Sequence, residues 1–159
     1  MTNVTIRDLT RENIYKVINL KLDEDQVDRV APNVYSIAES KVRTDFTPRV
    51  IYLAEEIIGF VMTDFDPNER EDRKFWIPRF MIDKRYQSKG YGKKAMHEVI
   101  RILMEHNECH YIGLSTEPDN EPAIAFYESL GFKKTGEFFE DEIILTLSIN
   151  EYKVLQQIG

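Results

Sequence analysis

The spacing of apolar residues predicts helices and strands that alternate along most of the chain. Residues 4–7 alternate apolar and polar side chains, as a short strand does. Thr10, with Asn13 three residues later, is a good N-cap for a helical pattern. The apolar residues at positions 14, 17, 18 and 22 then fall on one helical face. Pro32 interrupts this pattern, and a second helix is predicted over 33–41.

The middle of the chain is rich in β-branched and aromatic residues and predicts three strands. Residues 49–54 and 57–64 are joined by Glu55-Glu56, and this spacing predicts a hairpin. A turn at 66–68 and an exposed charged stretch at 69–74 should follow. The next predicted strand, 75–82, contains Pro78. Because proline has no N–H to donate, the sheet should bulge or splay at this point.

The second half alternates helices and strands. A helix should follow the glycines at 90 and 92, and a strand is predicted over 111–116. The next helix, 121–130, tolerates Pro122 in its first turn and ends at Gly131. Two strands, from Phe132 onward and over 142–149, complete the order. This order predicts an α/β fold with a mixed sheet, and 159 residues without a linker or repeat fit a single domain, 1–159.

Composition and charge exclude several classes of protein. A chain with 42% hydrophobic and 31% charged residues is neither disordered nor fibrous. Its net charge of −7 disfavours nucleic-acid binding. Cys109 has no second cysteine to pair with, so an intramolecular disulfide and a Cys-rich zinc site are both excluded. No apolar stretch is long enough to cross a bilayer, and the first residues lack a signal-peptide pattern, so we expect a cytoplasmic protein without membrane contact.

A basic, glycine-containing loop follows the strand that contains Pro78 and opens the next helix. The first N–H groups of a helix have no intrahelical partner and form an anion site. Gly90 and Gly92 leave room where a phosphate would approach closely. Positive charge comes from three lysines, Lys89, Lys93 and Lys94. We infer a pyrophosphate site, with a simple strand–helix turn as the alternative. The spacing matches neither a P-loop nor a dinucleotide-binding loop.

A second informative segment runs from Asn120 to Phe132, where a polar loop leads into a short helix. Apolar side chains at helical spacing, including Phe126 and Leu130, are typical of core packing. Tyr127 carries a hydroxyl that needs a hydrogen-bond partner if it is buried. Asn120 is suited to cap the helix.

Together the two segments resemble the GCN5-related N-acetyltransferase (GNAT) family. Residues 87–92 match its Q/R-x-x-G-x-G/A pattern, and residues 120–132 match N-x-x-A-x-x-F-Y-x-x-x-G-F without a gap. The resemblance implies a mixed, mostly antiparallel sheet that is splayed at its centre and flanked by helices. Stretches within 20–39 and the run 80–83 are similar, more narrowly, to the bacterial spermine/spermidine acetyltransferase branch.

The resemblance implies acetyl-CoA as cosubstrate and assigns residues to it. Backbone groups of Met81 and Ile82 would hold the pantetheine arm, and Asn120 and Ala123 would contact it. The pyrophosphate would be cradled mainly by backbone N–H groups of Gln87, Ser88, Lys89, Gly90, Tyr91, Gly92 and Lys93.

The resemblance also implies that a neutral amine attacks the thioester directly. Tyr127 matches the general acid of the family. A phenol, with a pKa of about 10, is suited to protonate a thiolate whose thiol has a pKa of about 8.5. A backbone N–H near Ile82 is the expected oxyanion donor. Glu117 is a candidate general base, with a solvated loop carboxylate as the alternative. The three histidines make no metal set, and no metal is expected.

Acidic residues of the predicted early helices are candidates for binding a cationic acceptor. Glu24 and Asp28 would share one helical face, and Glu39 follows Pro32. A polycation would be held by such carboxylates along a groove, although a solvated helix face is the alternative. Tyr35 and Trp76 would flank a methylene chain, with core packing as the alternative for Trp76.

The function predicted from these residues is acetyl transfer to a primary amine of spermine or spermidine. One alternative is another cationic amine, such as an aminoglycoside, a peptide or a protein amine. A second alternative is a non-catalytic acyl-CoA-binding regulatory module, although Tyr127 and the complete loop argue against it. Family analogy adds a possible homodimer.

Overall fold

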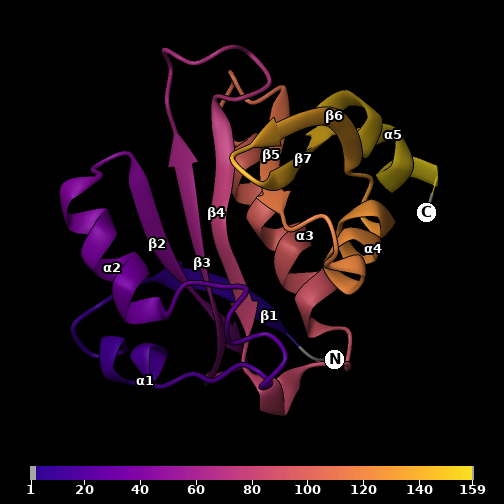
Figure 1. Cartoon of the computed structure of the whole chain (residues 1–159). Coiled ribbons are helices and arrows are strands. Elements are labelled where there is room, and N and C mark those ends of the chain that lie inside the picture. The colour runs from indigo at the N-terminus through magenta and orange to yellow at the C-terminus, as the bar shows by residue number, and fades with distance from the viewer. Residues whose placement is uncertain (1–2, 159) are drawn as a thin grey trace. The chain divides into compact units, whose positions relative to one another are not determined.

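The computed structural model describes residues 3–158 (Figure 1). The chain falls into two compact units. The first unit is Met1–Asp64 with Pro78–Val99, and the second is Phe65–Ile77 with Ile100–Gly159. Two elements contribute residues to both units, namely strand β4 (Phe75–Ile82) and helix α3 (Tyr91–Met104).

The first unit is built on antiparallel strands. Strand β2 (Phe46–Leu53) pairs with β1 (Val4–Asp8) on one side and with β3 (Glu56–Phe65) on the other. Helices α1 (Ile14–Ile18) and α2 (Asn33–Val42) lie together beside these strands (Figure 1). Apolar side chains from both helices and the strands form one core, whose buried members are Val17, Val50, Tyr52, Phe60, Met62 and Met81.

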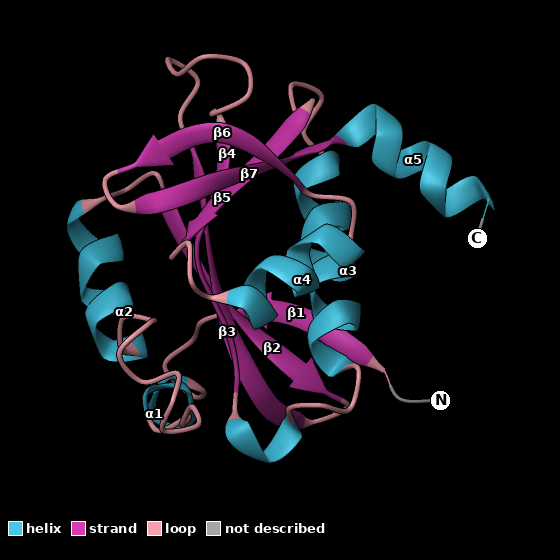
Figure 2. Cartoon of the chain, turned by 45° about the vertical axis from the view of Figure 1, so that its right-hand side comes forward, coloured by secondary structure: helices cyan, strands magenta, loops and turns pink. Residues whose placement is uncertain are grey.

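The second unit contains a long hairpin (Figure 2). Strand β7 (Glu142–Ser148) pairs antiparallel with β6 (Lys133–Phe139) and with β5 (Tyr111–Thr116), and it leads directly into helix α5 (Ile149–Ile158). Helix α4 (Glu121–Ser129) connects β5 to β6. The beginning of β4 runs parallel to β5, in a register that pairs Trp76 with Gly113.

The strands are hydrogen-bonded in the order β1-β2-β3-β4-β5-β7-β6. Only the β4–β5 pair, of those whose register is described, is parallel. This confirms the predicted α/β fold with a mixed, mostly antiparallel sheet and flanking helices. Pro78 lies two residues after Trp76 in β4, and a bulge or splay of the sheet at Pro78 stays a prediction.

The first predicted helix is shorter than its apolar pattern indicates. Thr10 and Asn13 do form a reciprocal pair of hydrogen bonds, but α1 ends at Ile18 and residues 19–32 contain turns without a helix. Leu20 and Leu22 still pack against the core, from irregular backbone. The prediction that Glu24 and Asp28 share a helical face is therefore wrong.

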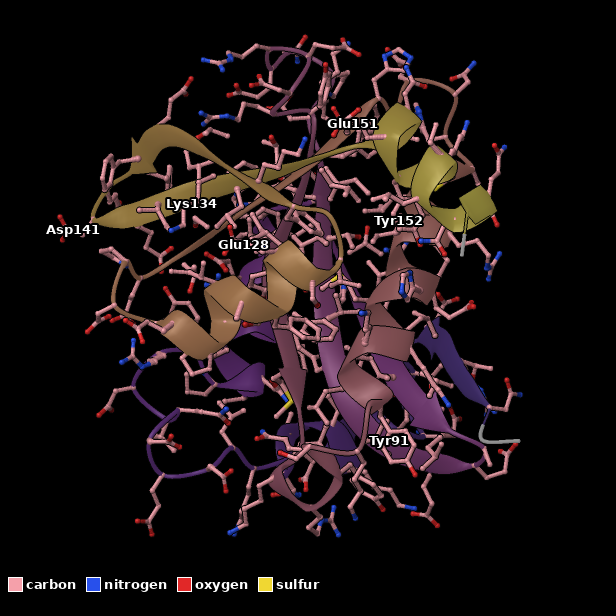
Figure 3. All side chains as sticks on the ribbon, turned by 90° about the vertical axis from the view of Figure 1, so that its right-hand side faces the viewer. Tyr91, Glu128, Lys134, Asp141, Glu151 and Tyr152 are labelled. Atoms are coloured by element: carbon pink, nitrogen blue, oxygen red, sulfur yellow. The ribbon has the colours of Figure 1, made fainter. Side chains whose placement is uncertain are left out.

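Two helical elements were missed by the sequence pattern. Asp83 caps the short 3₁₀ helix η1 (Lys84–Tyr86), and α5 closes the chain. In α5, the backbone N–H of Glu151 donates to the Ser148 hydroxyl, and Tyr152 is buried; both residues are labelled in Figure 3. Val154 and Leu155 remain exposed, which explains why apolar spacing alone gave a weak signal here.

The close approach of β3 and the end of β4 depends on a glycine. A Cβ added at Gly59 would lie 2.5 Å from the backbone oxygen of Met81, which has no freedom to move away. We expect Gly59→Ala to lower the free energy of unfolding by about 2 kcal/mol or more, because the strands must separate. Urea unfolding measures this loss. Glu12→Ala, at an exposed turn position, is the control and should change stability by less than about 0.5 kcal/mol. Equal stability of the two variants would contradict the packing argument.

Candidate active site

The loop after β4 begins at a buried carboxylate. Asp83 is 2% exposed, and its backbone N–H donates to the carbonyl of Ile58. Its side chain accepts hydrogen bonds from the backbone N–H of Lys21 and from the backbone N–H and Nε of Arg85, at 2.9–3.0 Å. Burial opposes the charge, but these hydrogen bonds outweigh it and the pKa of Asp83 lies below its usual value. The carboxylate therefore fixes where the loop starts.

The loop then takes a strained path toward α3. Ser88 has a φ of 62°, in the left-handed region that non-glycine residues rarely adopt, and Gly90 has a φ of 84°. A Cβ at Gly90 would meet no atom within 4 Å, so open space lies beside the backbone. Helix α3 starts at Tyr91, whose side chain is labelled in Figure 3, and the N–H of Lys94 bonds the carbonyl of Gly90. The N–H groups before Lys94 therefore precede the helical ladder, as an anion cradle requires.

Exposure of the loop side chains agrees with this role. Ser88, Lys89 and Gly90 are exposed, as are Lys93 and Lys94. Met81 and Ile82, which precede the loop, are buried. The loop thus follows two buried residues and exposes the side chains of three lysines to solvent. Binding of a pyrophosphate group by this loop stays a prediction.

The side chain of Gln87 makes two hydrogen bonds within the first unit. Its Nε2 donates to the backbone carbonyl of Ile82 at 2.8 Å and to Oε1 of Gln26 at 2.9 Å. The side chain of Gln87 is therefore engaged by protein. Any part that Gln87 takes in a phosphate site is left to its backbone N–H.

The predicted acceptor residues of the first unit have different surroundings. Glu24 and Asp28 are exposed on turns, and Tyr35 of α2 is 58% exposed. Glu39 of α2 is half-buried and forms an ion pair with Arg79 of β4, at 3.4 Å. Arg79 was missed by sequence reasoning, since it is distant from Glu39 in the chain and belongs to no motif. The guanidinium of Arg79 therefore offsets the negative charge of Glu39, the predicted acceptor carboxylate on α2.

In the second unit, Asn120 caps α4. Its Oδ1 accepts from the backbone N–H of Ala123 at 3.4 Å, and its Nδ2 lies 3.5 Å from the hydroxyl of Thr116. The helix ends at Ser129 with Leu130 as its C-cap, and Gly131 follows with a φ of 107°, as expected of a glycine just past a helix end. The capping interpretation of Asn120 is confirmed, while contact of Asn120 and Ala123 with the cosubstrate stays a prediction.

Tyr127 lies on α4 among aromatic side chains. Its ring makes edge-on contacts with Phe126 and Phe132, at centroid distances of 5.3 and 5.8 Å. Burial and the nearby negative charge of Glu142 raise the pKa of Tyr127 to about 12. The phenol thus stays protonated at neutral pH, as a proton donor must.

Glu142 of β7 is a second residue that sequence reasoning missed. Its Oε1 accepts a hydrogen bond of 2.7 Å from the hydroxyl of Ser115 on β5, and it influences the pKa of Tyr127. The hairpin register brings the start of β7 beside the end of β5, where Thr116 pairs with Ile143. A glutamate just after a turn gives no signal of this placement in the sequence.

Trp76, also predicted to contact the acceptor, packs within the second unit. A Cβ at Gly113 would lie 2.5 Å from the indole ring, so Trp76 lies directly over the glycine backbone. The guanidinium of Arg73 lies 5.7 Å from the ring centroid. Core packing, the alternative interpretation, accounts for these contacts, and a role in acceptor binding stays a prediction.

Residues 3–158 contain neither a candidate metal site nor a candidate membrane-spanning helix. No group of three or more histidine, cysteine, aspartate or glutamate residues in this range has the arrangement of a metal site. In the same range, no helix combines the length and the apolar character needed to cross a membrane.

Comparison with known proteins identifies the family. The sequence profile of the acetyltransferase (GNAT) family matches residues 14–132. The chain belongs to the GNAT acetyltransferase family. It is 31% identical over 138 residues to a spermine/spermidine N(1)-acetyltransferase of Bacillus subtilis, covering 85% of this chain and 91% of that protein. This GNAT enzyme is therefore an N-acetyltransferase, and its acetyl donor is acetyl-CoA.

Two other GNAT proteins extend the comparison. An N-alpha-acetyltransferase 30 of Xenopus laevis is 29% identical over 108 residues, which cover 66% of this chain and 39% of that protein. The fold is similar to that of an aminoglycoside acetyltransferase in complex with coenzyme A, with a TM-score of 0.76 and 19% identity, over 97% of this chain and 99% of the other. This structural likeness supports the GNAT fold.

The hydrogen bonds of Asp83 predict a large effect of Asp83→Asn. The amide would turn a donor toward the N–H of Lys21, so we expect a loss of about 2–3 kcal/mol in the free energy of unfolding at pH 7. Because the pKa of Asp83 is lowered in the folded protein, this stabilisation is present above the unfolded pKa of about 4 and is lost as the pH falls below it. Wild type and variant should therefore converge in stability toward acid pH, as measured by urea unfolding between pH 3 and 7.

The exposed Asp25→Asn is the matched control and should leave stability within about 0.5 kcal/mol at both ends of this range. A difference between wild type and Asp83→Asn that stays constant with pH would contradict the assignment of the lowered pKa.

Proposed function

We propose that this GNAT enzyme transfers the acetyl group of acetyl-CoA to a primary amine of a polyamine, spermine or spermidine. The observation that carries the proposal is the 31% identity to a spermine/spermidine N(1)-acetyltransferase over 85% of this chain. The residues of both sequence motifs are present and adopt fitting local structures: an open, strained loop at 87–92 and a capped helix with Tyr127.

In this proposal, the first unit binds the anionic and extended parts of the cosubstrate. The backbone N–H groups around Gly90 and Tyr91 bind the pyrophosphate, and the exposed lysines offset its charge. Backbone groups of Met81 and Ile82 bind the pantetheine arm. The hydrogen bonds of Asp83 fix where this loop starts, next to the residues that bind the pantetheine arm.

In the second unit, Tyr127 serves as general acid. Acetyl-CoA supplies a thioester, and its attack by a neutral amine releases a thiolate. The phenol of Tyr127 gives that thiolate its proton. Burial and Glu142 together keep the phenol protonated. A backbone N–H near Ile82 stabilises the oxyanion, and Glu117 accepts the proton of the incoming ammonium, directly or through water.

The acceptor proposal rests on carboxylates and an aromatic side chain. Glu24 and Asp28 are exposed, so either is free to meet a cation from solvent, and Tyr35 offers a face to a methylene chain. Glu39 already pairs with Arg79, so an ammonium would have to compete with a guanidinium there. Glu24 and Asp28 are therefore the stronger acceptor candidates.

A second candidate function is acetylation of a peptide or protein amine. The similarity to an N-alpha-acetyltransferase over 66% of this chain supports it. Location in the cytoplasm, homodimer formation and action of residues 1–159 as a single acetyltransferase domain belong to the main proposal as further predictions from the sequence. Size-exclusion chromatography with light scattering measures the mass in solution.

The acceptor is tested by thiol release from acetyl-CoA with a panel of amines. The panel contains spermine, spermidine, simple diamines, lysine, an aminoglycoside and peptides with a free α-amine. We expect kcat/KM to be highest for spermine or spermidine, by at least tenfold, because several carboxylates bind several charges.

Matched variants separate the acceptor carboxylates. Glu24→Gln and Asp28→Asn should raise the KM for spermine with little change in that for acetyl-CoA, and Asp25→Asn is the control. Preference for a peptide amine would overturn the polyamine proposal in favour of the second candidate. Binding of coenzyme A without turnover of any amine would favour a regulatory module.

The role of Tyr127 is tested by Tyr127→Phe. Removing the phenol hydroxyl should lower kcat by about 10²–10⁴-fold while the affinity for coenzyme A stays within about twofold. Phe126→Leu, on the same helix, is the control for packing and should retain most of the activity.

The pH profile gives an independent check on Tyr127. Its pKa of about 12 lies above the workable range, so the wild-type kcat should show no decline from phenol ionisation up to pH 10. A decline near pH 10 that Tyr127→Phe removes would contradict the raised pKa. Unchanged kcat in Tyr127→Phe would exclude the acid role itself.

A further inference from the structure

Three hydrogen bonds join the segment between α1 and α2 to the loop after β4. This connecting segment, residues 19–32, contains turns without a helix or strand. The backbone of Lys21 makes two of the contacts: its N–H donates to Asp83 Oδ2 at 2.9 Å, and its carbonyl accepts from the N–H of Lys84 at 2.7 Å. The side chains of Gln26 and Gln87 make the third, at 2.9 Å.

Gln26 stands at the junction of two turns of the connecting segment. Its N–H donates to the carbonyl of Asp23, and its carbonyl accepts from the N–H of Arg29. These turns carry Glu24 and Asp28. The side chain of Gln26 therefore ties the exposed acidic turns to Gln87, 61 residues further along the chain.

Gln87 belongs to the loop whose backbone is open to an anion. One nitrogen, Nε2, makes both of its side-chain contacts, to Ile82 and to Gln26. The residue that follows, Ser88, holds a left-handed conformation. A ligand that orders the backbone at 87–92 thereby also fixes the donor that Gln26 needs.

We propose that the Gln26–Gln87 hydrogen bond couples binding of coenzyme A to ordering of the connecting segment, and through it to binding of the amine. Gln26 is thus a positioning residue that acts through Gln87. The part that concerns the amine rests on the proposed function. Coupling of this kind is reciprocal, so the amine also tightens binding of coenzyme A by the same factor. One neutral hydrogen bond corresponds to a factor of about five.

Two variants of similar size test the contact. Gln26→Glu keeps an oxygen that accepts from Gln87 Nε2, whereas Gln26→Leu has no acceptor. Asp25→Asn changes charge at the neighbouring position and serves as control. Gln26 is half-buried, so we expect Gln26→Leu to fold, which thermal melting checks. Gln26→Ser, which is too short to reach Gln87, replaces it otherwise.

The first readout is hydrogen exchange of residues 19–32 with and without coenzyme A, followed by mass spectrometry. In wild type, Asp25→Asn and Gln26→Glu, coenzyme A should slow exchange of this segment about fivefold. In Gln26→Leu the slowing should disappear, and coenzyme A should bind about fivefold more weakly, because the coupling is reciprocal. Equal slowing in Gln26→Leu and wild type would overturn the proposal.

The second readout is steady-state kinetics with the best amine of the panel. Gln26→Leu should raise the KM for the amine about fivefold at unchanged kcat, and Gln26→Glu should restore it. A fall in kcat with unchanged KM would overturn the proposal.

Exchange depends only on coenzyme A, whereas turnover depends on the amine. If the proposed function fails, no amine is acetylated. If the coupling fails, spermine is acetylated but coenzyme A changes the exchange rates of all variants alike. The two failures are therefore distinguishable.

Discussion

The buried carboxylate of Asp83 is the constraint on which the first unit is organised. A charge at 2% exposure is costly unless its oxygens are hydrogen-bonded, and here three N–H groups bond to it. Those donors come from Lys21 and Arg85, while the Asp83 backbone joins Ile58 of β3. One residue therefore fixes the end of β4, the start of the phosphate loop and the segment after α1. A chain without this carboxylate would have to find other partners for each of them.

The residues at which chemistry is proposed include one with a strained backbone and one with a shifted pKa. The left-handed Ser88 and the open Gly90 lie in the loop, and the raised pKa of Tyr127 lies on α4. Hydrogen bonds and packing nearby support these residues. Asp83 holds the start of the loop, and the Asn120 cap and aromatic contacts hold the helix that carries Tyr127. Common hydrogen bonds and aromatic contacts thus position the strained loop and the buried phenol.

The sequence predicted elements well where local pattern and packing agree. Strands β4 and β5 match their predicted residues, and α2 differs only at its last residue, Val42. Prediction failed where tertiary contacts replaced local ones. Leu22 continues the helical spacing, but the bonds between Lys21 and residues 83–84 hold the backbone beside it in a non-helical conformation.

The candidate site shows the same division between residues with a local sequence signal and residues without one. Motif residues such as Gly90 and Asn120 carry their signal within a few positions, and their local geometry agrees with it. Arg79 and Glu142 gave no such signal, because their partners are distant in the chain and are brought near by helix packing and by sheet register. The proposed acceptor residues Glu24, Asp28 and Tyr35 belong to neither motif, which is why the sequence indicates the acetyl donor more firmly than the amine.

The packing of Trp76 on Gly113 gives the protein a built-in optical probe. The chain has one tryptophan, and this residue belongs to the second unit, where its indole lies over a bare peptide group. Its fluorescence therefore originates from that unit alone. Circular dichroism, by contrast, reports on the helices of both units. When the two signals are followed through one denaturation, coincident transitions indicate cooperative melting, and separate transitions reveal an intermediate in which one unit has lost its structure first.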